Sequence, residues 1–172
     1  MHPLDLFKYC PKCGSTHFGI HNGKSKKCSD CGFTYYFNPS AATVAFILNE
    51  NDELLVCRRG KEPAKGTLDL SGGFLDMYET GEEGVAREVK EETGLDVIRI
   101  DDWWGKCYSA IGFSNERNAC CVGVAGGTFS ESTSTQEEIV PGWYTKKEIR
   151  NLLKTEAFAV RTQAYCYLWC RQ

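Results

Sequence analysis

The sequence lacks the features that direct a chain into or across a membrane. No stretch approaches the roughly 18 consecutive apolar residues that a membrane-spanning helix needs. The opening residues, Met1 to Asp5, contain neither a positively charged segment nor an apolar core, so no export signal is visible. We therefore expect a cytoplasmic protein with no membrane partner.

An excess of basic residues is also missing. The 20 lysines and arginines are outnumbered by 23 aspartates and glutamates, which gives a formal net charge of -3. A nucleic-acid backbone is therefore not the obvious partner. The 172 residues are 42% hydrophobic and 25% charged, which is typical of a soluble globular protein with one ordinary domain and a small appendage.

Cysteine, in contrast, is abundant, with ten in the chain. Without an export signal, these cysteines are interpreted as metal ligands and reduced thiols before disulfides. Four of them lie in residues 1–38, a segment with few aliphatic side chains. The tripeptide Asn38-Pro39-Ser40 then interrupts the chain, because a residue before proline is pushed out of the helical region. We predict a small domain over residues 1–38 and a larger one over 39–172.

Two near-identical knuckles form the N-terminal motif: Cys10-Pro-Lys-Cys13-Gly and Cys28-Ser-Asp-Cys31-Gly. A gap of two residues lets both thiolates of one knuckle reach the same ion, and two such pairs complete a tetrahedral sulfur site suited to structural Zn²⁺. Two disulfides or free thiols are the alternative. His17 and His21 are rival ligands, but four thiolates already satisfy the metal. The segment resembles the zinc ribbon family.

Periodicity and turn residues predict the elements of the larger domain. Apolar runs indicate strands over 41–48, 54–57, 97–108 and 119–125, with a short one at 143–144. Helices are expected over 80–93, 146–153 and 157–169. The polar tract 130–135 is interpreted as a flexible loop.

The helix expected at 80–93 carries most of the candidate chemistry. At about 100° per residue, Glu88, Glu91 and Glu92 fall on one face, and Val85 and Val89 form a stripe that can face the core. Clustered carboxylates repel one another, but they are the ligands that Mg²⁺ or Mn²⁺ prefers. A solvated helix face is the alternative. Arg87 offers charge to offset the repulsion, and Gly94 is placed to end the helix.

These glutamates belong to a longer motif, the string from Gly73 to Leu95. It fits the Nudix box, Gly-x5-Glu-x7-Arg-Glu-U-x-Glu-Glu-x-Gly-U with U aliphatic, at every fixed position. The region from about residue 40 to 172 therefore resembles the Nudix hydrolase family. The resemblance implies an α/β fold: an α/β/α sandwich with a mixed sheet, preceded here by the small zinc-ribbon domain.

The resemblance also implies roles for residues. Glu88, Glu91 and Glu92 would bind Mg²⁺ or Mn²⁺, with Glu88 also a candidate base for the attacking water. A base from the late loop is common in the family, and we expect Glu138 rather than Glu137 there. Glu79 would support the helix, and Arg87 would orient the glutamates. Ser71 stands where the family usually has proline, Met77-Tyr78 replaces a turn that usually bears proline or glycine, and Gly84 weakens the helix.

The substrate is harder to predict. A zinc ribbon ahead of a Nudix domain is similar to the NADH pyrophosphatase and NAD-decapping subfamily, which carries a proline-rich stretch after the box. Residues 100–113 contain no proline here. Trp103 and Trp104 are candidates for stacking a base, although strand aromatics are more often core. Arg58 is a candidate phosphate contact, or a solvated charge.

We accordingly predict metal-dependent hydrolysis of a pyrophosphate bond in a nucleoside-diphosphate-linked substrate. The alternatives are an NADH pyrophosphatase-like activity specifically, or a non-catalytic nucleotide-binding regulator. A third class is an adaptor built around the ribbon, which requires a basic aromatic surface; Lys24, Lys26 and Lys27 are a hint of one. The expected partner is a nucleotide-type small molecule, and a homodimer stays open.

Overall fold

The structure is a computed structural model of the whole chain. It describes residues 2–38, 40–62, 64–111, 114–130 and 139–171, without the side chains of 102–120 and of several positions in the last helix. The chain divides into two compact units. Met1–Ser40 and Tyr108–Glu116 form the cysteine-rich unit, and Ala41–Cys107 with Arg117–Gln172 form the larger unit. The predicted boundary at residue 38 stays a prediction.

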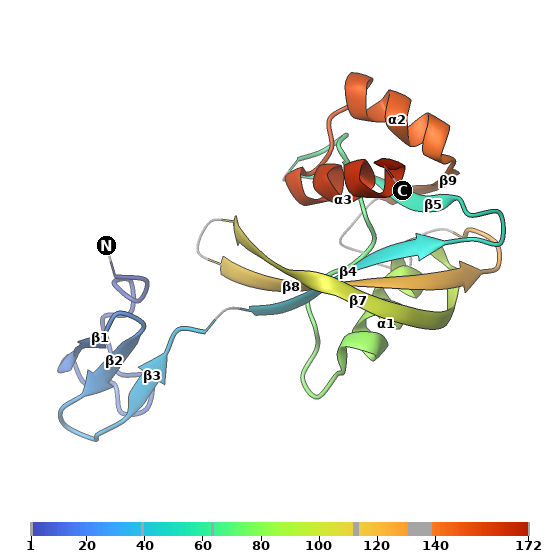
Figure 1. Ribbon diagram of the computed structural model, residues 1–172. Helices are drawn as coiled ribbons and strands as arrows, with labels where there is room; N and C mark the ends of the chain where they lie inside the picture. Colours follow the sequence, from blue (N-terminus) through green and yellow to red (C-terminus); the bar gives the residue numbers. More distant parts are fainter. Residues whose placement is uncertain (1, 39, 63, 112–113, 131–138, 172) are drawn as a thin grey trace. The chain divides into compact units, whose positions relative to one another are not determined.

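The cysteine-rich unit is built on a three-stranded antiparallel sheet (Figure 1). Its strands are β1 (Phe18–Asn22), β2 (Ser25–Cys28) and β3 (Thr34–Tyr36), in the order β1-β2-β3. Cys10, Phe18 and Cys28 are buried together, with Cys31 and Phe33 packed against them. The small core thus forms around the knuckles and not around aliphatic side chains.

The larger unit contains a six-stranded sheet in the order β6-β5-β4-β8-β7, with β9 paired to β5. The strands are β4 (Ser40–Leu48), β5 (Leu54–Arg59), β6 (Leu68–Asp69), β7 (Asp96–Ile111), β8 (Ser114–Gly126) and β9 (Ile139–Tyr144). Each expected strand is therefore present, although β7, β8 and β9 are longer than predicted. The strand β6 was not predicted, because two residues are too few to show a strand pattern.

Strand alternation sends apolar side chains to both faces of this sheet. Val44 and Phe46 of β4 pack with Ile149 and Trp169, from the helices α2 (Lys146–Thr155) and α3 (Val160–Arg171). On the opposite face, Ala45, Ile47, Leu55 and Cys57 pack with Val85 and Val89 of α1 (Gly81–Thr93). Because successive residues of a strand point to opposite faces, the two clusters are separate layers. Figure 1 shows α1 on one side and α2 and α3 on the other, the expected α/β/α sandwich with a mixed sheet.

The start of the last helix differs most from the predicted helix boundaries. The last helix begins at Val160 and not at residue 157. Before it, Leu68 donates a backbone hydrogen bond to the carbonyl of Ala157 and accepts one from the amide of Ala159, at 2.9 Å each. This pairing holds residues 157–159 extended. The predicted helix included Phe158 because of its apolar spacing, but the contact with β6 keeps this residue out of the helix. Of the described helices, none combines the length and the apolar character that crossing a bilayer requires.

Candidate active site

Helix α1 is fixed at both ends. At its start, the Thr80 hydroxyl accepts from the Glu83 amide at 3.2 Å, and the Glu83 carboxylate accepts from the Thr80 amide at 2.8 Å. This reciprocal pair is a capping box, which satisfies two amides that the first turn leaves unpaired. At its end, Gly94 adopts φ 79° and its amide bonds to the carbonyl of Lys90. The predicted helix and its glycine cap are confirmed, and the register of the glutamates is thereby set.

Burial of one stripe of α1 orients the glutamates. Val85 and Val89 are fully buried against the sheet, as predicted. Exposure then rises around the helix: the side chain of Glu88 is 16% exposed and that of Glu91 is 41% exposed, while Glu92 is buried. The three carboxylates therefore run from the protein interior to solvent along one edge of the helix.

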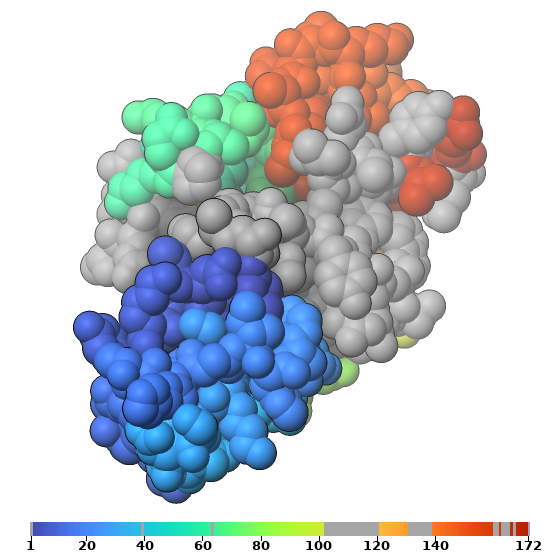
Figure 2. All heavy atoms as spheres, turned by 90° about the vertical axis from the view of Figure 1, so that its left-hand side faces the viewer, coloured from blue at the N-terminus to red at the C-terminus, as the bar shows by residue number. Residues whose placement is uncertain are grey.

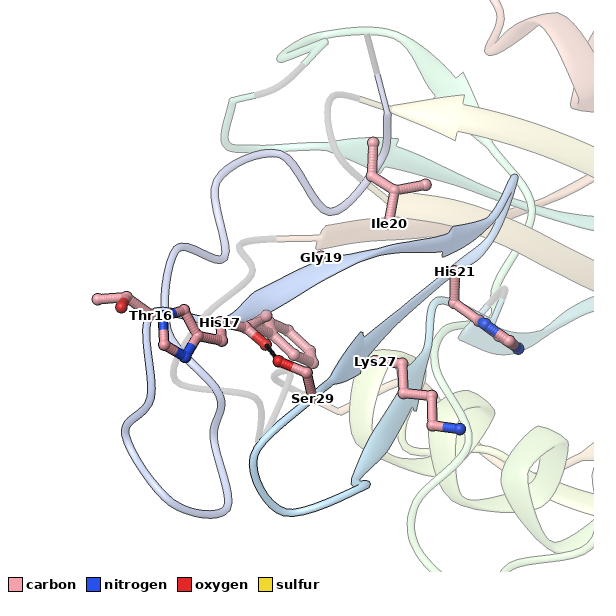
Figure 3. Close-up of a pocket in the computed structure, with 8 residues that line it drawn as sticks. Thr16, His17, Gly19, Ile20, His21, Lys27 and Ser29 are labelled. Carbon is pink, nitrogen blue, oxygen red and sulfur yellow. Dashed lines mark hydrogen bonds between the residues drawn. The ribbon is translucent and has the colours of Figure 1, made fainter.

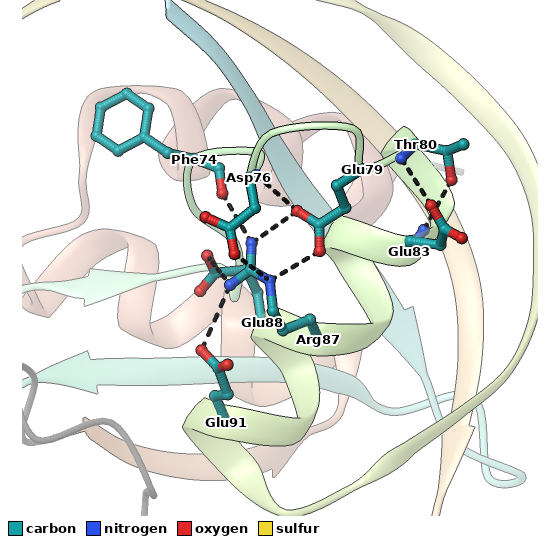
Figure 4. Close-up of polar contacts among 8 residues, drawn as sticks. All are labelled: Phe74, Asp76, Glu79, Thr80, Glu83, Arg87, Glu88 and Glu91. Atoms are coloured by element: carbon teal, nitrogen blue, oxygen red, sulfur yellow. Dashed lines mark hydrogen bonds and ion pairs between the residues drawn. The ribbon is translucent and has the colours of Figure 1, made fainter.

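Arg87 is the centre of a polar network that ties the preceding loop to the helix (Figure 4). Its Nε and Nη2 donate to the two oxygens of Glu79 at 2.8 and 2.9 Å, and Nη2 also donates to the Phe74 carbonyl at 2.8 Å. Its Nη1 donates to Glu88 at 2.9 Å and to Glu91 at 3.4 Å. The guanidinium thus offsets the repulsion among the carboxylates, as the sequence predicted.

The electrostatic consequence is mutual. Hydrogen bonds from Arg87 are the main cause that lowers the pKa of Glu79, and burial opposes them. The hydrogen bond to Glu79 is in turn the main cause that raises the pKa of Arg87, with Glu88 adding to it. The carboxylate of Glu79 is therefore ionised at neutral pH. It binds Arg87 of α1, in agreement with the expectation that Glu79 supports the helix.

Glu92 is held by different donors. The Ser71 hydroxyl donates to its Oε2 at 2.5 Å, and the Gly72 amide approaches the same oxygen at 3.3 Å. Ser71 is fully buried and Glu92 is 6% exposed, so the charged group depends on these contacts in place of water. Burial, together with the nearby negative charge of Glu92, raises the pKa of the Cys57 thiol well above its usual range. Glu92 is thus a carboxylate fixed inside the protein.

Two glycines of the loop before the helix have no room for a side chain. A Cβ on Gly73 would lie 2.4 Å from Oε1 of Glu88. A Cβ on Gly72, which has φ 145°, would lie 2.3 Å from the carbonyl oxygen of Thr43. Gly72 therefore allows the loop to approach the backbone of Thr43, and Gly73 allows it to approach the carboxylate of Glu88.

The donor set of the carboxylate face fits a hard divalent cation. Glu88, Glu91 and Glu92 offer oxygen ligands only, which Mg²⁺ and Mn²⁺ prefer to nitrogen or sulfur. The backbone of Gly73 lies against the carboxylate of Glu88, and the exposure of Glu91 opens the face to solvent. In this conformation Arg87 engages Glu88 while Ser71 engages Glu92.

The cysteine cluster is already assembled for a metal. The four Sγ atoms of Cys10, Cys13, Cys28 and Cys31 lie within 4.8 Å of one another. In the described part of the chain, no other group of His, Cys, Asp or Glu side chains is gathered this closely. Cys10 and Cys31 sulfurs are 3.7 Å apart, as are those of Cys13 and Cys28. Tetrahedral Zn²⁺ with bonds of about 2.3 Å places its sulfurs about 3.8 Å apart. The geometry is compatible with a zinc ribbon.

Backbone amides in the knuckles favour thiolates. Hydrogen bonds from the backbone amides of Cys31 and Asp30 lower the pKa of the Cys28 thiol to about 7, although burial opposes them. None of the described cysteines forms a disulfide. His17 pairs with Asp30 at 3.0 Å instead of joining the cluster, which agrees with its omission from the predicted ligands.

The structure tests no role of the remaining predicted residues. Arg58 lies on the sheet face opposite α1, where its guanidinium contacts the Gly66 carbonyl at 2.8 Å and Glu156 at 3.2 Å. Trp103 and Trp104 belong to β7, and their side chains are outside the described residues, as is Glu138 together with the tract 131–135. The substrate and catalytic roles of these residues stay predictions.

Several contacts of the site were not predicted. The contact between Ser71 and Glu92 could not be predicted, because 21 positions separate the two residues. The contacts of Arg87 with Asp76, at 3.7 Å, and with the Phe74 carbonyl were not predicted either. The capping box was visible in Thr80-Gly-Glu-Glu83, since a threonine followed three residues later by glutamate before an apolar stripe is its pattern.

Comparison with known proteins agrees with this geometry. A family model, the NUDIX domain, matches residues 38–165. The NAD-capped RNA hydrolase NudC of Vibrio atlanticus is 34% identical over 99 residues, covering 58% of this chain and 36% of that protein. The ADP-ribose pyrophosphatase of Methanocaldococcus jannaschii is 43% identical over 63 residues, or 37% of each chain. The mitochondrial NAD(P)H pyrophosphatase NUDT13 of Homo sapiens is 26% identical over 151 residues, covering 87% of this chain and 42% of that protein. The chain thus spans 36–42% of the length of these relatives.

Solved structures show the same fold. A NUDIX hydrolase from Nitrosomonas europaea matches with a TM-score of 0.71 at 20% identity, covering 91% of this chain and 86% of that one. The MutT protein from Methanosarcina mazei Go1 matches with a TM-score of 0.59 at 26% identity, covering 80% and 97% of the two chains.

Proposed function

The chain belongs to the Nudix family, and on that premise we propose that it hydrolyses the pyrophosphate bond of a nucleoside-diphosphate-linked compound. Nudix enzymes use divalent metals and act on nucleotide-type substrates. The observation that carries the proposal is the complete box folded on α1, with Arg87 joined to Glu79, Glu88 and Glu91 and with Glu92 fixed by Ser71. Oxygen ligands at three levels of exposure on one helix support Mg²⁺ or Mn²⁺ binding there.

In the proposed reaction, each residue of the face has a distinct task. A bound divalent cation polarises the phosphoryl oxygens and lowers the pKa of the attacking water. Glu88 accepts the proton of that water, whose oxygen bonds to one phosphorus as the bridging phosphorus–oxygen bond breaks. The other half of the substrate leaves with its own phosphate, so the products are two phosphate monoesters. Glu91 and Glu92 hold the cation, and Arg87 orients Glu88. Glu138, from the late loop, is the alternative base.

The substrate is proposed by class. The names of the relatives describe pyrophosphatases acting on ADP-ribose and NAD(P)H, so dinucleotides and nucleoside-diphosphate sugars are the first compounds to test. NADH pyrophosphatase-like activity is the more specific candidate, since the match to the human NAD(P)H pyrophosphatase covers 87% of this chain. We propose Trp103 and Trp104 for base stacking and Arg58 for a substrate phosphate.

The test is a hydrolysis screen with Mg²⁺ and Mn²⁺ over dinucleotides, nucleotide sugars, ADP-ribose and nucleoside triphosphates. On the best substrate, Glu88→Gln should lower the rate by about 10²–10⁴-fold, the range for loss of an acid–base group. Its melting temperature should hardly change, because glutamine still accepts from Arg87 while one repelling charge is removed.

The matched control is Glu82→Gln, which removes one charge from the exposed first turn of the same helix. Its rate should equal that of the wild type. Near-full activity in the Glu88 variant, or tight nucleotide binding with no hydrolysis of any compound, would contradict the proposal. The second outcome would instead favour a nucleotide-binding regulator.

We further propose that Cys10, Cys13, Cys28 and Cys31 hold one structural Zn²⁺. The sulfur spacings support it, and elemental analysis should return about one zinc per chain. Cys13→Ser should lose it and unfold the cysteine-rich unit, because a metal of this kind supplies much of the folding free energy of a small domain. Free thiols throughout the described residues favour a reducing compartment, so we propose a cytoplasmic location.

A further inference from the structure

The net charge of the chain conceals an uneven distribution. Residues 1–40 contain five lysines and two aspartates and no arginine or glutamate, a formal charge of +3, while the whole chain carries -3. The remaining residues therefore carry -6. The basic excess that the complete sequence lacks is present in residues 1–40, the part of the cysteine-rich unit that forms the blue surface of Figure 2.

A hollow of about 340 Å³ lies on the sheet of this unit (Figure 3). Lys27, His21 and His17 line it together with the hydroxyl residues Thr16 and Ser29 and with Phe18, Gly19 and Ile20. No acidic side chain is among its described lining residues. The neighbouring carboxylate, Asp30, is engaged by Ser15 at 2.5 Å and by His17 at 3.0 Å. The hollow therefore presents the Lys27 ammonium and polar side chains to solvent, beside the exposed side chain of Ile20.

Strand register places these groups on one face of the sheet. Gly19 lies opposite Lys27, and Lys27 lies opposite Thr34, so the three residues cross the sheet on the same face. Tyr36, two residues along β3, points to that face as well and is 47% exposed. Lys26 points to the other face, where its Nζ donates to the Phe7 carbonyl at 2.8 Å. The face thus combines a central lysine with a histidine at each end and an exposed aromatic ring at its margin.

We propose that this face of the cysteine-rich unit binds single-stranded nucleic acid. Its lining residues Thr16, His17, His21, Lys27 and Ser29 are all exposed, so the hollow does not enclose a small ligand as a typical pocket does. An open basic groove instead suits the backbone of an extended polyanion, and an exposed ring beside it suits stacking on an unpaired base. Lys27 and His21 contact phosphates, and Tyr36 stacks on a base. The proposal does not depend on the hydrolase activity.

The experiment measures the fluorescence anisotropy of a labelled single-stranded RNA of about ten nucleotides against the full chain. A DNA strand of the same sequence is measured in parallel. No divalent cation is added, so hydrolysis is silent and its failure leaves the affinity unaffected. We expect binding of both strands at low salt that weakens as salt increases. Lys27→Ala should lower the affinity several-fold and reduce the slope of log K against log salt by about 0.7, one phosphate contact on a single strand.

The matched control is Lys147→Ala, which removes an exposed lysine from α2 in the larger unit. It should bind like the wild type. Zinc content is measured in each variant, so that loss of the fold is separated from loss of the contact. Absence of binding at low salt overturns the proposal. Equal affinity and equal salt slopes for the Lys27 and Lys147 variants also overturn it, as does saturation by a mononucleotide at the same concentration as the strand.

Discussion

The hydroxyl of Ser71 donates to Oε2 of Glu92 over 2.5 Å, and both residues are withdrawn from solvent. A carboxylate in such a place is stable only if donors replace its water. The Gly72 amide, at 3.3 Å, is the other donor that reaches this oxygen from the same loop. The serine that replaces the usual family proline is therefore a positioning residue for a proposed metal ligand.

Ser71→Ala should lower the free energy of unfolding by about 1–3 kcal/mol, because a buried carboxylate loses a donor. It should also weaken Mn²⁺ binding, since Glu92 is no longer held. Urea denaturation and Mn²⁺ titration by electron paramagnetic resonance measure the two effects. Thr43→Val is the control: its hydroxyl is buried without a hydrogen-bond partner, so the change should be neutral or stabilising. Equal losses in both variants would show that the Ser71 contact has no special value.

Alanine at the two adjacent glycines should separate folding from function. At position 72 the new Cβ meets backbone at 2.3 Å from a φ of 145°, so Gly72→Ala should lower the melting temperature clearly. At position 73 the Cβ meets the end of the flexible Glu88 side chain. Gly73→Ala should therefore keep its stability and lose metal affinity and turnover. Calorimetry and activity assays distinguish the two, and a stable, fully active Gly73→Ala enzyme would contradict the geometry.

Acid should destabilise the protein partly through Glu79. Arg87 lowers the pKa of this carboxyl in the folded state, so the unfolded chain binds the proton more readily. The contribution to stability is complete above the ordinary glutamate pKa of about 4.3 and is lost as pH falls through the lower, folded value. In Glu79→Gln, the curve of unfolding free energy against pH should lose slope in that window. A slope equal to that of the wild type would show that other acidic groups account for the whole effect.

Local features of the fold were predictable because they depend on neighbours in sequence. The helix over Gly81–Thr93 follows from the buried stripe of Val85 and Val89 and from the glycine at its end. The clustering of four cysteines follows from the spacing within each knuckle. The guanidinium of Arg87 lies one helical turn from Glu91, so their contact is a matter of helix geometry.

Features that depend on contacts across the chain were not predictable in this way. The extended conformation of residues 157–159 comes from Leu68, on a strand too short to be recognised by its own pattern. The contact of Arg58 with Glu156 joins residues 98 positions apart, while the phosphate-binding role of Arg58 stays a prediction. The basic face of the cysteine-rich unit was obscured by the acidic excess elsewhere in the sequence.

The backbone hydrogen bonds of Leu68 with Ala157 and Ala159 also bear on the order in which parts of the chain can fold during synthesis. Strand β6 leads into the loop of Ser71 and Gly72, and it completes its backbone hydrogen bonds only with residues made much later. Long-range pairing of this kind is slow because the intervening chain must close a loop first. Leu68 therefore completes these two hydrogen bonds only after residue 159 has been synthesised, well after the whole box from Gly73 to Leu95.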